Sequence, residues 1–195
     1  MSHQFHQSTH KGEEPPFWDF VRNLIQKPSK EITECQKPKA VLLPVGEMQF
    51  PYQWAPDLIP TQLLRIGDVV ITGLPAEFTT MSGRRVRDAV TKAFADSGQK
   101  VNVVLTGLAN TYSNYVATYE EYQIQRYEGG STLYGPHTLQ AYVQQFTYLS
   151  NSMAKKARIA PGPQFPNLLK QEITLKTGVV LDTPGIGHNF GNQLF

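Results

Sequence analysis

The chain has 195 residues, of which 40% are hydrophobic and 17% are charged, and its 18 basic and 16 acidic side chains leave a formal net charge of +2. This near-neutral balance excludes the basic footprint that is typical of nucleic-acid-binding proteins. No apolar run approaches the ~20 residues of a membrane span, and the first residues lack the apolar stretch of a signal peptide. The composition therefore predicts one soluble domain, or one domain with a piece of another.

The sequence predicts little regular structure in the N-terminal third of the chain. Residues 1–16 are polar and carry His3, His6 and His10, which we interpret as a solvated segment rather than a metal site. Apolar residues at helical spacing predict a helix over residues 17–27 that ends before Pro28. Residues 29–60 are rich in proline, which indicates an irregular connector.

Residues 61–106 have the clearest order and predict a βαβ unit. The β-branched residues within 61–75, bounded by Gly67 and Pro75, indicate a hairpin or one kinked strand. A capped helix follows, with apolar residues on one face and Gly98 past its end. The apolar run at 103–105 is typical of a strand that is covered on both faces. Strand, helix and strand together predict a right-handed crossover and an α/β fold.

A third helix is predicted after Pro136, because apolar residues from Leu139 to Met153 recur at helical intervals. Residues 159–166 are rich in proline and glycine and indicate a domain boundary. The remaining residues, 167–195, contain two strand-like runs and are too few for an independent core. We interpret Arg84, Arg85 and Arg87 as the solvent-facing side of the helix in the βαβ unit.

Polar side chains follow both strands of the predicted βαβ unit. Loops that leave the carboxyl ends of parallel strands lie side by side, so Glu77 is expected close to Tyr112 and Tyr115. Carboxylate and phenol oxygens can bind zinc, but Glu77 also suits a helix N-terminus and a tyrosine usually packs. Neither His137 nor His188 stands in an H-x-x-H type motif. The residues alone predict a tyrosine-lined polar edge and leave a metal role open.

Long strings of the sequence resemble the neutral/alkaline, non-lysosomal ceramidase family, the N-acylsphingosine amidohydrolases. They are "PFWDFVR", "WAPDLIPTQLLRIGDVVI", "GLPAEFTTMSGRRVRDAV" and "TYEEYQIQRYEGGSTLYGPHTL". The resemblance runs from about Phe5 to the last residues. It implies that residues 17–158 are the C-terminal portion of a mixed, partly parallel α/β catalytic domain. By the same resemblance, residues 159–166 are a linker and 167–195 begin an immunoglobulin-like domain.

The resemblance also implies the site and its chemistry. The family holds one zinc ion, whose glutamate and tyrosine ligands fall on Glu77 and Tyr115. A further tyrosine, which hydrogen-bonds the substrate carbonyl or its oxyanion, falls on Tyr127. The other tyrosines of this segment, Tyr112 among them, are then interpreted as packing. Zinc lowers the pKa of a bound water to about 7, so the implied reaction is hydrolysis of ceramide to sphingosine and fatty acid at a membrane surface.

Two zinc histidines and a catalytic serine of the family lie upstream of the part that this sequence matches. We therefore expect the chain to be part of a larger, secreted or cell-surface enzyme and to be inactive alone. Cys35, the only cysteine, is a free thiol or half of a bridge, and the resemblance implies a bridge to an upstream partner. The alternative is a catalytically incompetent homologue that binds lipid or a partner. Nucleotide binding is disfavoured because residues 75–83 lack both the P-loop and the GxGxxG pattern.

Overall fold

The computed structural model describes residues 20, 23–39, 41, 43–50, 52–124 and 127–167. The chain divides into two compact units, Met1–Phe165 and Pro166–Phe195, and the fold given below is that of the first. The polar segment 1–16 and the expected start of an immunoglobulin-like domain lie outside the described residues, apart from Asn167. Residues 157–167 form neither helix nor strand. No helix in the described ranges is long and apolar enough to cross a membrane.

The proline-rich connector is more regular than its composition predicts. It contains the helix α2 (Lys30–Cys35) and the 3-10 helix η1 (Val45–Glu47). The side chain of Ser29 caps α2 by accepting a hydrogen bond of 3.1 Å from the Ile32 amide. The expectation of an irregular segment is therefore wrong here, because a capping serine directly after Pro28 starts a helix. Upstream of that proline, the described helical residues end at position 25, before Pro28 as predicted but two residues short of the predicted end.

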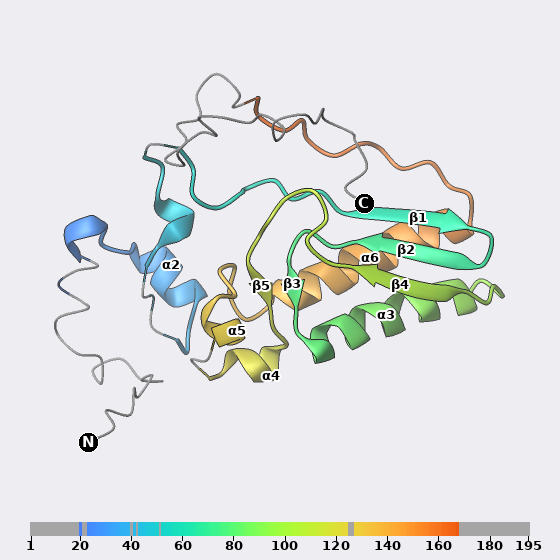
Figure 1. Cartoon of the computed structure of the whole chain (residues 1–195), viewed down its shortest axis with the longest axis horizontal. Coiled ribbons are helices and arrows are strands. Elements are labelled where there is room, and N and C mark those ends of the chain that lie inside the picture. Colours follow the sequence, from blue (N-terminus) through green and yellow to red (C-terminus); the bar gives the residue numbers. More distant parts are fainter. Residues whose placement is uncertain are drawn as a thin grey trace, which may run out of the picture. The chain divides into compact units, whose positions relative to one another are not determined.

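A three-stranded sheet forms the regular centre of the fold (Figure 1). Strands β1 (Gln62–Ile66) and β2 (Val69–Gly73) form an antiparallel hairpin, which decides between the two predicted alternatives. Gly67 supplies the left-handed backbone of its turn, with φ of 62°. Strand β4 (Asn102–Thr106) pairs with β2 in parallel, so that the sheet order is β1-β2-β4.

Two long helices pack against one face of this sheet and against each other. The helix α3 (Thr80–Ala95) connects β2 to β4 and completes the predicted βαβ unit. The helix α6 (Thr138–Ala154) runs beside α3 and contacts β1. The core lies between these layers, and its fully buried members include Val70, Val86, Val90, Phe94 and Phe146. The three arginines of α3 are exposed, as predicted.

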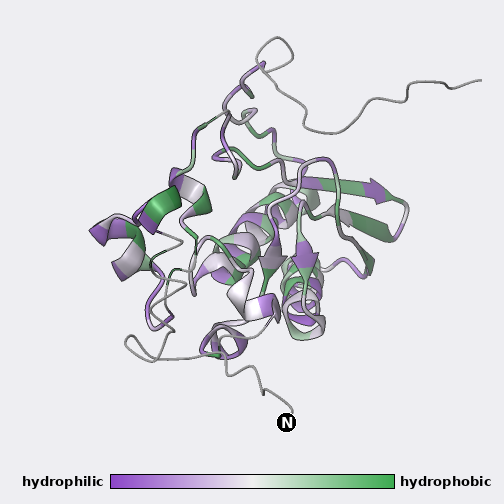
Figure 2. Cartoon of the chain, turned by 60° about the vertical axis from the view of Figure 1, so that its left-hand side comes forward, coloured by the Kyte–Doolittle hydropathy of each residue, from purple (hydrophilic) through white to green (hydrophobic). Residues whose placement is uncertain are grey.

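The opposite face of the sheet is exposed among the described residues. Leu64, Ile66 and Val104 are 59%, 73% and 48% exposed, and Figure 2 shows long hydrophobic stretches on the hairpin strands. The prediction that the second strand is covered on both faces is therefore wrong. Exposure alternates along β4, because α3 and α6 cover only one side of the described sheet.

Four short elements complete the unit. In the sequence, one lies between β2 and α3, and three lie between β4 and α6. The two-residue strands β3 (Glu77–Phe78) and β5 (Tyr115–Val116) pair in parallel and form a second, small sheet. The helix α4 (Tyr119–Tyr122) begins three residues after the end of β5, and α5 (Tyr127–Gly130) follows α4. These elements gather at the end of the unit where α3 begins (Figure 1).

Truncation of a core side chain should lower the stability of the fold. We expect Phe146→Ala to lower the free energy of unfolding by about 3–5 kcal/mol, because the ring is fully buried between α6 and the sheet. Tyr148→Ala on the same helix is the control, since this ring is 53% exposed, and it should change stability by less than about 0.5 kcal/mol. Equal losses in urea denaturation of the two variants would contradict the assigned packing.

Candidate active site

The parallel pairing of β3 with β5 brings two predicted site residues together. Glu77 pairs directly with Tyr115, so that both side chains leave the same face of the small sheet. Backbone hydrogen bonds hold this register on either side. The Glu77 amide donates to the Asn114 carbonyl at 2.9 Å, and the Thr79 amide donates to the Val116 carbonyl at 3.1 Å.

Two phenols contact the carboxylate of Glu77, and a third lies beside one of them. The Tyr112 hydroxyl donates to Glu77 Oε1 at 2.6 Å, and hydrogen bonds from Tyr112 and then Tyr115 lower the pKa of Glu77. The same contact raises the pKa of Tyr112 to about 12, and its hydrogen bond to Glu77 raises the pKa of Tyr115 as well. The ring of Tyr127 meets that of Tyr115 edge to face, with centroids 5.4 Å apart.

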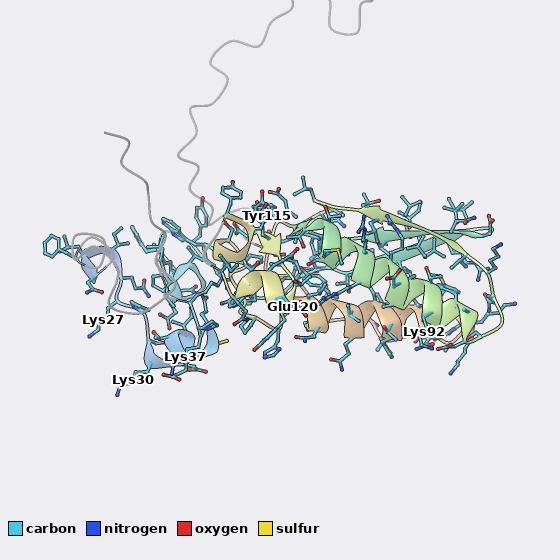
Figure 3. All side chains as sticks on the ribbon, turned by 90° about the horizontal axis from the view of Figure 1, so that it is seen from below. Lys27, Lys30, Lys37, Lys92, Tyr115 and Glu120 are labelled. Carbon is cyan, nitrogen blue, oxygen red and sulfur yellow. The ribbon has the colours of Figure 1, made fainter. Side chains whose placement is uncertain are left out.

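Sequence reasoning placed Tyr112 near Glu77 but gave it no role in the site. Its interpretation as packing is wrong, because its ring is exposed and its hydroxyl binds Glu77. The signal that could have found it is its place in the same strand-exit loop as Tyr115, three residues earlier. Tyr115 lies at the end of the unit near α4 and α5, opposite the end of α3 that carries Lys92 (Figure 3).

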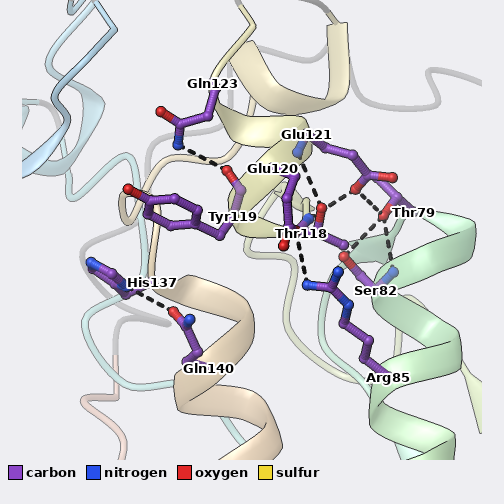
Figure 4. A network of polar contacts seen from close by, with 10 residues as sticks. All are labelled: Thr79, Ser82, Arg85, Thr118, Tyr119, Glu120, Glu121, Gln123, His137 and Gln140. Carbon is purple, nitrogen blue, oxygen red and sulfur yellow. Dashed lines mark hydrogen bonds and ion pairs between the residues drawn. The ribbon is translucent and has the colours of Figure 1, made fainter.

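A residue that sequence reasoning missed, Glu121, joins the caps of the two helices that follow the small sheet (Figure 4). Thr79 caps α3, and Thr118 caps α4 in a capping box with Glu121. Glu121 Oε2 accepts from the Thr79 hydroxyl at 2.6 Å and from the Thr118 amide at 2.8 Å. Because Thr79 directly follows β3 and Thr118 lies two residues after the end of β5, this carboxylate fixes the relative position of Glu77 and Tyr115.

Further contacts tie α4 to the two long helices. Arg85 of α3 binds Glu120 at 2.9 Å, and this hydrogen bond, the largest cause, lowers the pKa of Glu120 to about 2. On the other side, the ring of His137 stacks on Tyr119 at 5.5 Å and bonds to Gln140 (Figure 4). His137 is therefore occupied in packing at the start of α6.

An open hollow of about 650 Å³ adjoins the small sheet. Its volume lies in the range of small-molecule sites. Its lining combines acidic, phenolic and apolar side chains, including Glu77, Phe78, Tyr115, Glu121, Ile124 and Glu128. A second hollow, of about 510 Å³, lies along α3 and also includes Glu77. The Glu77 carboxylate thus stands between two concave surfaces.

The oxygen atoms of this site are of a kind that binds zinc, but they are fewer than a complete zinc site needs. A carboxylate and a phenol on one face are oxygen ligands that zinc accepts. Within the described part of the chain, no group of three or more His, Cys, Asp or Glu side chains lies close enough to hold a metal ion. Glu77 and Tyr115 could contribute two oxygen ligands, fewer than the four of a tetrahedral zinc site. Tyr127 lies next to them, and Cys35 is exposed and free.

Comparison with known sequences places the chain among ceramidases. The sequence model of the family described as "Neutral/alkaline non-lysosomal ceramidase, N-terminal" matches residues 1–144. Neutral ceramidase 3 of Arabidopsis thaliana is 53% identical over 179 residues, which are 91% of this chain and 24% of that protein. The neutral ceramidase of Oryza sativa is 50% identical over 192 residues, which are 96% and 24% of the two chains.

Solved structures agree with the sequence matches. The neutral ceramidase of Pseudomonas aeruginosa matches with a TM-score of 0.74 and 40% identity, over 93% of this chain and 29% of that one. A structure titled "Ceramidase complexed with C2" matches equally well over 94% and 28% of the two chains. The chain spans about a quarter of the length of the curated relatives it matches. These matches also confirm the mixed α/β fold.

The hydrogen bond from Tyr112 should set the acidity of Glu77. We expect Tyr112→Phe to raise the pKa of the Glu77 carboxyl, because the charged form loses its strongest donor. Carbon-13 NMR titration of the metal-free chain measures this pKa. Tyr119→Phe is the control, since that ring stacks on His137 instead. An unchanged Glu77 pKa in Tyr112→Phe would contradict the assigned contact.

The two adjacent glutamates of α4 should differ in their contribution to stability. We expect Glu121→Ala to lower the free energy of unfolding by about 1–2 kcal/mol, because two helix caps lose their shared acceptor. Glu120→Ala removes only an exposed ion pair with Arg85, so its loss should be smaller. Urea denaturation compares the variants, and a larger loss in Glu120→Ala would show that the cap bridge is not what holds α3 and α4.

Proposed function

This chain belongs to the neutral/alkaline non-lysosomal ceramidase family, and from this we propose that it takes part in zinc-dependent hydrolysis of the amide bond of ceramide. The products are sphingosine and a fatty acid, and the reaction belongs to a larger enzyme of which this chain supplies part of the catalytic domain. The observation that carries the proposal is the register of the small sheet, which pairs Glu77 with Tyr115.

Different residues of this chain would bind the metal ion and orient its ligands in the proposed site. Glu77 and Tyr115 would contribute two oxygen ligands to zinc, which when bound supplies an acidified water and polarises a carbonyl. Tyr112 orients the Glu77 carboxylate through its hydrogen bond of 2.6 Å, as a partner behind a metal ligand commonly does. The backbone bonds on both sides of this pair keep the two oxygens on one face.

Tyr127 is the proposed donor to the substrate. Its ring packs edge to face on Tyr115 and is 70% exposed, so it adjoins the ligand pair and remains accessible to a bound molecule. A neutral phenol can donate a hydrogen bond to the oxyanion that develops at an amide carbonyl under attack. Loss of one such donor typically lowers the rate by about 10²-fold.

The family resemblance also suggests where the enzyme acts. We propose that it acts on ceramide at a membrane surface and is secreted or faces outward. An immunoglobulin-like domain from residue 167 and a disulfide partner for Cys35 stay predictions. The alternative is a homologue without catalysis that binds lipid or a partner. It is favoured by the small number of metal-binding groups that the described residues bring together.

A chimera tests the proposed reaction. This chain replaces the matching segment of Neutral ceramidase 3 from Arabidopsis thaliana, with which it is 53% identical, and fatty-acid release from ceramide is measured together with zinc content. We expect activity, and we expect Glu77→Ala to lower both zinc content and kcat/KM, the latter by about 10²-fold or more.

The control in the chimera is Glu120→Ala, which alters a nearby exposed carboxylate outside the hollow. It should keep zinc and activity. Full zinc content and full activity in Glu77→Ala would overturn the ligand assignment. A folded chimera that releases no fatty acid would favour the alternative function.

A further inference from the structure

Lys39 is the one charged side chain among the buried residues that the structure describes, and it is 5% exposed. A buried lysine is uncommon unless it has strong partners. Here the ammonium lies over the ring of Tyr122, 3.4 Å from its centroid, and donates a hydrogen bond to the carbonyl oxygen of Gly129. Burial lowers its pKa to about 8, so the side chain is charged at neutral pH.

The partners of Lys39 belong to the segment that carries Tyr127. Tyr122 ends α4, and Gly129 lies in α5, whose first residue is Tyr127. Residues of the connector 29–60 form two more hydrogen bonds with this segment. The Tyr122 hydroxyl donates to the Gln36 carbonyl at 3.0 Å, and Gln36 Nε2 donates to the Leu133 carbonyl at 2.8 Å. Residues 36–39 therefore hold both ends of the chain around α5.

The packing around Gly129 leaves α5 little freedom. A Cβ atom at this position would lie 2.8 Å from the carbonyl oxygen of Ile124 and 3.0 Å from that of Glu121. The backbone of α5 thus approaches the end of α4 as closely as a glycine allows. Gly129 also lines the same hollow as Glu77 and Tyr115, so the contact that Lys39 makes lies directly behind the site.

We propose that Lys39 is a positioning residue, whose ammonium fixes α5 through the Gly129 carbonyl and the Tyr122 ring and thereby holds Tyr127 against Tyr115. The inference rests on the proposed function of Tyr127. Methionine has nearly the volume of lysine, but it would leave the Gly129 carbonyl without this donor and the Tyr122 ring without its cation. The substitution therefore removes the clamp with little change in packing.

A double-mutant cycle in the ceramidase chimera tests the role in catalysis. We expect Lys39→Met to lower kcat by about tenfold or more at unchanged zinc content, because misplacement of a catalytic group is costly. In a Tyr127→Phe background the same substitution should lower kcat no further. Lys37→Met is the matched control, since Lys37 is exposed in the same loop and pairs with Glu34. An equal loss of kcat in both backgrounds, or no loss, would overturn the proposal.

A second readout does not require activity. In the 195-residue chain, Lys39→Met should speed amide hydrogen exchange in residues 127–132 and leave residues 86–94 of α3 unchanged. Exchange that is unaltered at 127–132, or faster throughout the chain, would show that Lys39 does not hold α5 in particular. If the unsubstituted chimera is inactive, the proposed function fails, and the exchange result still decides whether the clamp exists.

Discussion

The parallel pairing of β3 with β5 in one register is the constraint on which the candidate site depends. Each strand has two residues, so few ladder hydrogen bonds fix their alignment. A shift by one residue would turn one of the two side chains to the opposite face. The register is held by the backbone bonds that flank Glu77 and by the Glu121 carboxylate, which joins the helix caps behind both strands.

Core residues pack directly against this polar region. The ring of Phe78 meets that of Tyr142 edge to face at 5.1 Å, and the Tyr142 hydroxyl lies 3.1 Å from Ser113 Oγ. Ser113 also donates to the Pro75 carbonyl from its amide and its hydroxyl. The two strand-exit loops are therefore fastened to each other and to α6. Side chains of the core and of the site alternate along the same short strands, which couples stability to site geometry.

Much of the regular fold could be predicted, because local patterns determine it. The βαβ unit follows from the apolar face of α3, the Thr79 cap and the β-branched strands, and the proximity of Glu77 to Tyr115 follows from strand topology. The same topology predicts that Tyr112 lies near Glu77, but not their hydrogen bond, which also depends on a loop with left-handed backbone at Leu108, Asn110 and Asn114. Asparagine is enriched in this conformation, but leucine rarely adopts it, so residue propensity does not indicate the backbone at Leu108. The burial of Lys39 likewise depends on long-range contacts with α4 and α5.

The most direct test of the account is a nuclear Overhauser measurement on the 195-residue chain with labelled glutamate, tyrosine and phenylalanine. We predict cross-peaks between the Tyr115 ring protons and the side-chain protons of Glu77, because both side chains leave one face of the small sheet. Cross-peaks from the Tyr115 ring to Phe78 in place of Glu77 would place the strands one residue out of this register. That result would contradict the shared site.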